Sequence, residues 1–209
     1  MALDEALLEA MPRLGHPVLR FYGWIEKAAS FGYFQKFADV ERMTLLRPLV
    51  RRPTAGGLVA HDADFTYGLI FPTNDPWYSL SATESYRRVH EWIQRAFTRL
   101  NIATELAERR RDAGGGQCFV GYEKYDVLSK GRKIAGAAQR RRRDGLLIQG
   151  SVQPPNSIAE AEWHEAMCQV PEAEQGIRWV ELEPDSALKA RAAELAQRKY
   201  SQAVHNQKR

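Results

Sequence analysis

The sequence lacks long apolar runs and is poor in cysteine. No stretch reaches the roughly 18 consecutive apolar residues of a membrane-spanning helix, and Cys118 and Cys168 are too few for a disulfide framework or a zinc site. The first eleven residues, MALDEALLEAM, have neither the basic start nor the cleavage site of a signal peptide. They instead predict an amphipathic helix. We therefore expect a cytoplasmic protein that does not bind membranes.

Patterns typical of metal and nucleic-acid binding are also missing. His61, His90 and His164 occur singly, without an H-x-x-x-H pair, so no metal site is predicted. The net charge is only +4, which favours acidic partners without requiring nucleic acid. The arginine run at 140–143 has no interleaved aromatic residues of the kind that stack on bases.

The 209 residues suit one domain of α+β class. The clearest helix is predicted over 81–100, where Ser81 and Glu84 form a capping box and apolar residues recur at helical spacing. Asp185 is the predicted N-cap of a helix over 185–204. Further helices are expected at 37–46 and 157–167. Strands are expected at 16–24, 28–35, 101–106, 125–131, 132–141 and 145–152, with two more around a glycine turn within 49–72. The segment RRRDG is predicted to be the turn between the last two strands of the chain.

Three short segments carry candidate chemistry. In RRPTAGGLVAHD, two arginines suit a carboxylate or phosphate and the glycines permit close approach of a ligand, whereas the alternative is an exposed hairpin turn. In GRKIAGAAQ, Lys133 lies in an apolar strand next to small residues. It suits a bound anion or a polarised carbonyl, or else it protects an edge strand. Cys118 follows three glycines, which favours an exposed nucleophile, but free cysteines are more often buried packing residues.

Together these segments resemble one family. MALDEALL, LRFYGW, FGYFQ, RRPTAGGLVAHD, TYGLIFP, CF, YDVLSKGRKIAGAAQRR and LLIQGSV follow the order and spacing of the lipoate–protein ligase and octanoyltransferase family. The match covers about residues 1–153 of a single catalytic domain spanning 1–209, and 154–209 is predicted to be a C-terminal helical segment. The resemblance implies a central mixed β-sheet flanked by helices, as in the biotin–protein ligases.

The chain is most similar to the cysteine-dependent transferases of this family. That resemblance implies that octanoyl passes from octanoyl-acyl carrier protein to Cys118 as a thioester, with Lys133 as its electrostatic partner. A lysine of a lipoyl domain, in glycine cleavage H protein or dehydrogenase E2 subunits, then accepts it without any cofactor. We expect a monomer. The implied acyl-site residues are Arg51, Arg52, Thr54, Gly56, Gly57, His61 and Gly136, and the proposed docking residues are Arg140, Arg141, Arg142 and Arg143.

Two alternatives stay open on the sequence. An ATP-dependent lipoate ligase would use ATP and Mg²⁺, with its accessory domain on a separate subunit, and would not need Cys118. A non-catalytic relative would only bind acyl chains or lipoyl domains. Two positions depart from the family pattern: Ala55 replaces a glycine, and Gln149 replaces the histidine of an HGS motif. The second departure leaves open whether the site turns over.

Overall fold

A six-stranded sheet forms the centre of the computed structural model, which describes residues 1–112, 116–154 and 158–208. Its strand order is β1-β5-β9-β8-β7-β6, and all neighbours are antiparallel. The strands are β1 (Val18–Tyr22), β5 (Phe65–Phe71), β6 (Glu105–Leu106), β7 (Val127–Ser129), β8 (Arg132–Arg142) and β9 (Gly145–Val152). The α+β class with a helix-flanked central sheet is therefore confirmed.

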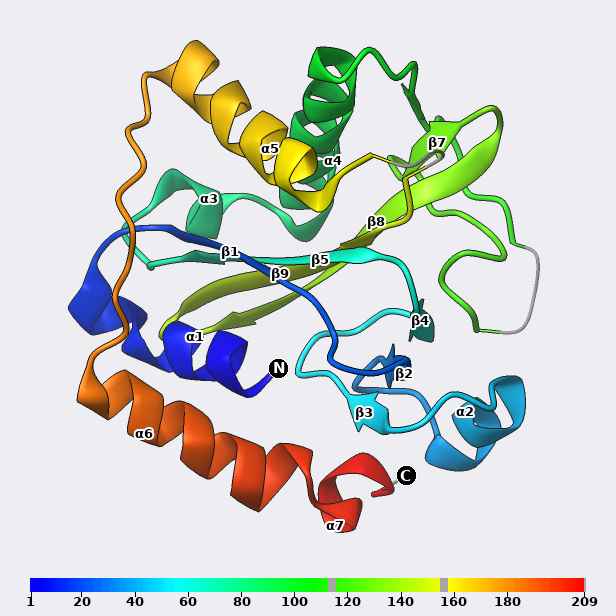
Figure 1. Ribbon diagram of the computed structural model, residues 1–209, viewed down its shortest axis with the longest axis vertical. Helices are drawn as coiled ribbons and strands as arrows, with labels where there is room; N and C mark the ends of the chain where they lie inside the picture. Colours follow the sequence, from blue (N-terminus) through cyan, green and yellow to red (C-terminus); the bar gives the residue numbers. More distant parts are fainter. Residues whose placement is uncertain (113–115, 155–157, 209) are drawn as a thin grey trace.

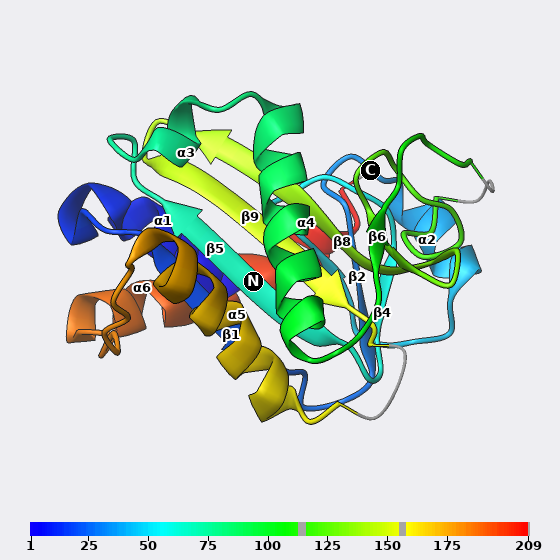
Figure 2. The same cartoon turned by 90° about the horizontal axis from the view of Figure 1, so that it is seen from above.

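Helices cover both faces of this sheet (Figures 1 and 2). On one face lie α3 (Pro76–Ser79), α4 (Ala82–Arg99) and α5 (Glu160–Gln175), and on the other lies α1 (Ala2–Leu14). Ser81 caps α4 as predicted by accepting a hydrogen bond from the Glu84 backbone N–H. The apolar stripe of α4, including Val89, Ile93 and Phe97, is buried in the main core. Within the described residues, no helix is both long enough and apolar enough to cross a membrane.

A separate three-stranded sheet lies at one end of the molecule, next to α2 (Phe37–Met43). Its order is β3 (Leu49–Arg51), β2 (Ala28–Phe31), β4 (Val59–His61), and β2 and β3 are parallel. The prediction of two strands around a glycine turn was wrong, because residues 49–72 form three strands. The glycine loop does not close a hairpin, because β2 lies between β3 and β4 and pairs with both. Within the loop, the buried Arg52 side chain donates to the carbonyls of Ala55 and Gly57.

The hairpin between β8 and β9 is tighter than predicted. Arg140, Arg141 and Arg142 continue strand β8 and pair with Leu147, Leu146 and Gly145 of β9. Only the two residues at 143–144 form the turn. The predicted hairpin turn between these strands is therefore confirmed, and it is short because the ladder of backbone hydrogen bonds continues through Arg142.

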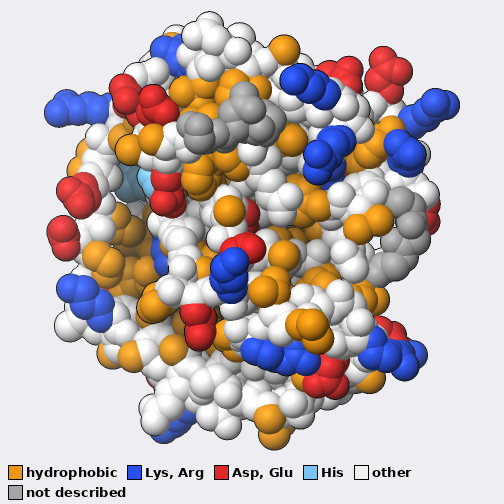
Figure 3. Space-filling view, turned by 45° about the vertical axis from the view of Figure 1, so that its right-hand side comes forward, with side chains coloured by type: hydrophobic (Ala, Val, Ile, Leu, Met, Phe, Trp, Pro, Cys, Tyr) orange, Lys and Arg blue, Asp and Glu red, His pale blue; other side chains and the backbone are white. Residues whose placement is uncertain are grey.

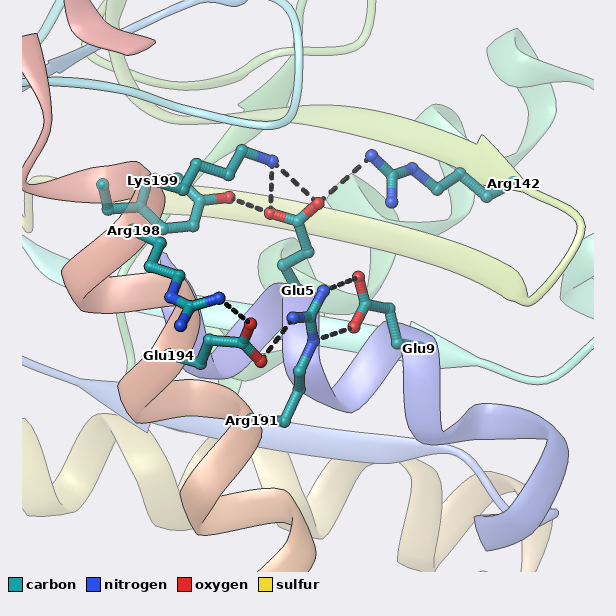
Figure 4. Close-up of polar contacts among 8 residues, drawn as sticks. Glu5, Glu9, Arg142, Arg191, Glu194, Arg198 and Lys199 are labelled. Carbon is teal, nitrogen blue, oxygen red and sulfur yellow. Dashed lines mark hydrogen bonds and ion pairs between the residues drawn. The ribbon is translucent and has the colours of Figure 1, made fainter. Parts of the chain in front are cut away.

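The C-terminal segment packs along α1 (Figure 1). It consists of α6 (Ser186–Leu195), a π-helical turn η1 (Ala196–Tyr200) and α7 (Ala203–Asn206), and Asp185 caps α6 as predicted. Figure 4 shows the ion pairs that join it to α1. Lys199 donates to both oxygens of Glu5 at 2.8 and 2.6 Å, and Arg191 binds Glu9 through two nitrogens.

Candidate active site

Cys118 and Lys133, the two predicted catalytic residues, lie together. The Lys133 Nζ donates a hydrogen bond to the Cys118 Sγ at 3.3 Å. Lys133 projects from β8, and Cys118 lies in the loop that precedes β7. Two backbone hydrogen bonds fix this loop against Leu58: Leu58 N–H donates to Gly116 O, and Cys118 N–H donates to Leu58 O, both at 2.9 Å. Gly114 and Gly115, predicted to expose the thiol, lie outside the described residues, whereas Gly116 is described at a φ of +67° that favours glycine.

Asp126, which sequence reasoning did not single out, holds Lys133 in place. Its Oδ2 accepts from Lys133 Nζ at 2.7 Å and from the Glu123 backbone N–H at 2.7 Å. Its Oδ1 accepts from the Tyr86 hydroxyl on α4. Burial lowers the pKa of Lys133, but the nearby Cys118 and Asp126 outweigh burial and raise it. Lys133 is therefore a fixed ammonium group whose position depends on α4 and the start of β7.

The only signal for Asp126 in the sequence is its place in the YD pair before β7, where it reads as the start of a strand. A single aspartate in such a position has no distinguishing pattern. One partner, Tyr86, lies on α4, 40 positions earlier in the sequence. The other, Lys133, lies on β8, the strand that pairs with β7. Tertiary packing alone brings these residues together.

The small residues after Lys133 have a steric purpose at Gly136. A Cβ atom added there would lie 2.5 Å from the Lys133 Cε and 2.6 Å from its Nζ. Both distances are far below normal contact, so a side chain would displace the lysine. The lysine lies back over its own strand because position 136 has no side chain.

A pocket opens beside Cys118 and contains four of the predicted acyl-site residues. Its wall includes Arg52, Gly56, His61 and Gly136, together with Cys118 itself. Gly57 supports the same region from behind: its carbonyl accepts from Arg52 Nη2 at 2.8 Å, and a Cβ there would lie 3.1 Å from Cys118 N. The surface that these residues expose to the pocket is mostly apolar.

Arg51 lies outside this pocket, although it was predicted to line the acyl site. Its guanidinium is fully buried and donates to the carbonyl oxygens of Tyr33, Gln35, His205 and Asn206. Successive residues of a strand point to opposite sides, so adjacent arginines separate at the end of β3. Arg51 therefore ties the C-terminal α7 to the small sheet, and only Arg52 faces the pocket.

Thr54, predicted to line the acyl site, does not line the pocket but contacts Gln149, which does. The Thr54 hydroxyl donates to Gln149 Oε1 at 2.9 Å, and Gln149 Nε2 donates to the buried carboxylate of Asp4 at 2.7 Å. Both ends of the amide are thus used to join α1 to the loop after β3. Gln149 has a structural role here that does not depend on proton transfer.

The four predicted docking arginines diverge in space. Arg140 donates to Pro53 O at 3.0 Å, Arg141 donates to Tyr78 O, and Arg142 forms an ion pair with Glu5 at 3.1 Å. Arg143 is 94% exposed, with Asp144 as a weak partner at 3.7 Å. The run is therefore not a continuous basic patch.

The fold and site define a catalytic domain in which a buried ammonium faces a thiol beside an apolar pocket. The chain belongs to the lipoyl protein ligase A/B catalytic domain family, whose model matches residues 1–166.

Curated relatives place the chain near one branch of that family. It is 38% identical over 160 residues to Octanoyltransferase LipM of Carboxydothermus hydrogenoformans, and 36% identical over 171 residues to Octanoyltransferase LipM of Bacillus subtilis. Each match covers 73% of this chain and 59% of the relative. The chain thus spans about three fifths of the length of these relatives.

Solved structures support the fold. A lipoate-protein ligase A bound with ATP has a TM-score of 0.77 at 21% identity, covering 99% of this chain and 92% of that one. A Thermoplasma acidophilum protein with bound lipoic acid has a TM-score of 0.77 at 20% identity, covering 100% and 94%. At these identities the likeness concerns the fold alone.

Proposed function

We propose that this protein transfers an octanoyl group from acyl carrier protein, through a thioester on Cys118, to a lysine of a lipoyl domain. The observation that carries the proposal is the 3.3 Å contact between Lys133 Nζ and Cys118 Sγ beside an apolar pocket. The names of the curated relatives favour the transferase over the ligase. Glycine cleavage H protein and dehydrogenase E2 subunits are the proposed acceptors.

In the first step, the Cys118 thiolate attacks the thioester carbonyl of the donor. A bond forms between the carbonyl carbon and the Cys118 sulfur, and the bond between that carbon and the sulfur of the carrier breaks. The leaving thiolate then takes up a proton from solvent. The exchange replaces one thioester by another and requires no ATP or metal. The Lys133 ammonium favours the attacking thiolate and the developing oxyanion.

In the second step, the acceptor lysine attacks the Cys118 thioester as a neutral amine. The carbon–nitrogen bond forms, the carbon–sulfur bond breaks, and the amine proton goes to solvent or to the departing thiolate. Because an amide is more stable than a thioester, this step drives the transfer forward. Lys133 is then again next to the thiolate that it stabilised before acylation.

Intact-mass spectrometry tests the proposal. Octanoyl-acyl carrier protein, supplied without ATP, should add one octanoyl group that hydroxylamine removes, and Cys118→Ala should not form this adduct. Lipoate-stimulated ATP–pyrophosphate exchange that survives Cys118→Ala would identify the ligase instead. Binding of the donor without any adduct or exchange would identify a non-catalytic protein.

A test of the proposed docking residues should change an arginine that makes no structural contact. On the side of the molecule seen in Figure 3, acidic and basic side chains are interspersed. Arg143 is the member of the run that can be reversed without breaking a buried contact. Arg143→Glu should raise the KM for acyl carrier protein and leave the melting temperature unchanged. An unchanged KM would remove Arg143 from the proposed surface.

We further propose that the protein acts as a monomer in the cytoplasm. A thiol nucleophile needs a reducing compartment to remain free. Size-exclusion chromatography with light scattering tests the monomer, and a peak at twice the chain mass of 23.8 kDa would contradict it.

A further inference from the structure

Arg52 is a buried cation that has no carboxylate partner among the described residues. Its guanidinium donates to three neutral oxygens: Ser30 Oγ at 2.9 Å, Ala55 O at 2.9 Å and Gly57 O at 2.8 Å. Burial lowers the pKa of Arg52 to about 10. A buried charge without a counterion is costly, so its retention points to an anion in the pocket.

Ser30 is the end of a hydrogen-bonded chain that leads away from Arg52. Ser30 Oγ lies 2.6 Å from His61 Nε2, and His61 Nδ1 lies 2.8 Å from Asp64 Oδ2. All three side chains are buried. The Trp24 ring stacks on the His61 ring at 4.1 Å and fixes its plane.

One assignment of protons gives every donor in this chain an acceptor. A neutral His61 donates its Nδ1–H to Asp64 and accepts the Ser30 hydroxyl proton at Nε2. The Ser30 oxygen then turns its lone pairs toward Arg52. The carboxylate thereby strengthens the hydrogen bond to Arg52 through two neutral groups, without forming an ion pair that would cancel the guanidinium charge.

Arg52 also lies in the same part of the molecule as Cys118. Both residues line the same pocket. One carbonyl that binds Arg52 belongs to Gly57, where an added Cβ would lie 3.1 Å from the Cys118 backbone nitrogen. Cys118 counteracts burial by raising the pKa of Arg52. Asp64, by contrast, is separated from the guanidinium by both Ser30 and His61.

We propose that Arg52, positioned by Ser30, His61 and Asp64, is a second cationic partner of the Cys118 thiolate. Lys133 is already paired with Asp126, so its net field at the sulfur is reduced, whereas Arg52 supplies a positive charge with no adjacent carboxylate. This inference deepens the proposed thioester chemistry by assigning what stabilises the nucleophile. The titratable and charged groups that share the pocket with Cys118 are Arg52 from the loop after β3, Tyr22 from β1, His61 from β4 and the amino group of Met1. Lys133 from β8 and Tyr86 from α4 also interact with the thiol.

The test is the pH dependence of Cys118 alkylation by iodoacetamide in a Cys168→Ala background, followed by intact mass. Arg52→Gln should raise the midpoint by roughly one pH unit, which slows alkylation about tenfold below the midpoint. Arg52→Lys keeps the charge but cannot make all three hydrogen bonds of the guanidinium. Its midpoint should therefore lie between those of Arg52→Gln and wild type. Ser85→Ala changes a buried serine on α4 that takes no part in the hydrogen bonds from Asp64 to Arg52, and it should leave the midpoint unchanged.

A double-mutant cycle tests the positioning chain. Ser30→Ala should raise the midpoint when Arg52 is present and have no effect in the Arg52→Gln background. An unchanged midpoint in Arg52→Gln would overturn the role of Arg52, and should that variant not fold, an unchanged midpoint in Arg52→Met, which also removes the charge, would do the same. An equal Ser30→Ala shift in both backgrounds would overturn the positioning chain. Alkylation needs no acyl donor, so these results hold even if no octanoyl adduct forms.

Discussion

Replacing Asp126 by asparagine should remove the support of Lys133 while barely changing the shape of the side chain. In the wild type, both Asp126 oxygens act only as acceptors, for donors on Lys133, Tyr86 and Glu123. Asparagine offers one acceptor oxygen and two N–H donors. Either orientation of its amide turns an N–H toward one of these donors, so the network is broken whichever way it lies.

The expected loss of stability follows from the burial of the pair. The Lys133 and Asp126 side chains are 5% and 0% exposed. Removing one partner of such a pair costs about 3–5 kcal/mol when the other stays charged. For a chain of this length, a loss of about 3 kcal/mol lowers the melting temperature by about 6–12 °C. Tyr86→Phe, which removes one neutral donor from the same carboxylate, should cost less, about 1.5–3 kcal/mol.

The pKa of Lys133 determines how the stability difference between wild type and Asp126→Asn changes with pH. In the wild type the pKa of Lys133 is raised above 10.5, so its stabilising contribution is complete below 10.5 and is lost as pH rises through the folded value. Without Asp126, the pKa of Lys133 is lower than in the wild type, because burial still opposes the charge and only Cys118 still raises the pKa. Lys133 then loses its proton at a lower pH in the variant, which relieves the cost of its unpaired buried charge. The stability gap between wild type and variant should therefore be widest near neutral pH and narrow as pH increases.

Two assays check this prediction. Urea unfolding at pH 7 and at pH 10 measures the gap, and the rate of octanoyl-adduct formation measures the site. Losing a fixed charge of this kind should slow acylation by about 10²–10³-fold. A variant with wild-type unfolding and wild-type acylation, or a gap that does not change with pH, would refute this account of Asp126.

Three further predictions concern other positions. Gly136→Ala should slow adduct formation at least about tenfold by displacing Lys133 with little loss of stability, whereas Gly23→Ala, where a Cβ meets nothing within 4 Å, should leave the rate unchanged; equal rates would contradict the steric argument. Gln149→His should keep adduct formation within about threefold of wild type, because the amide has a structural role; a loss above about 100-fold would show that Gln149 itself is needed in the reaction. Burial raises the pKa of Glu5, but its ion pairs outweigh burial and lower it below 4.5, so its contribution to stability is present above pH 4.5 and lost as pH falls through the folded value. Urea midpoints at pH 7 and pH 3 should therefore differ less in Glu5→Gln than in wild type, and equal differences would contradict this.

Local signals in the sequence determined much of the framework. Ser81 predicts the start of α4 because a cap needs only the residues that follow it, and the apolar stripe of α4 is buried where its spacing predicts. The family pattern placed Cys118 and Lys133 in one site, and the structure brings them within hydrogen-bonding distance. These features depend on neighbours along the chain or on a motif of fixed order.

The tertiary structure alone decided how charged residues are used. The adjacent Arg51 and Arg52 look equivalent in sequence, yet Arg51 binds the C-terminal α7 and Arg52 lines the pocket next to Cys118. Asp126 becomes the support of Lys133 only when α4 brings Tyr86 to it. A charged side chain shows no periodicity that reveals its partner, because the partner is set by which elements pack together. The sequence thus determined which elements form and marked Cys118 as the candidate nucleophile, and packing decided which cations lie around it.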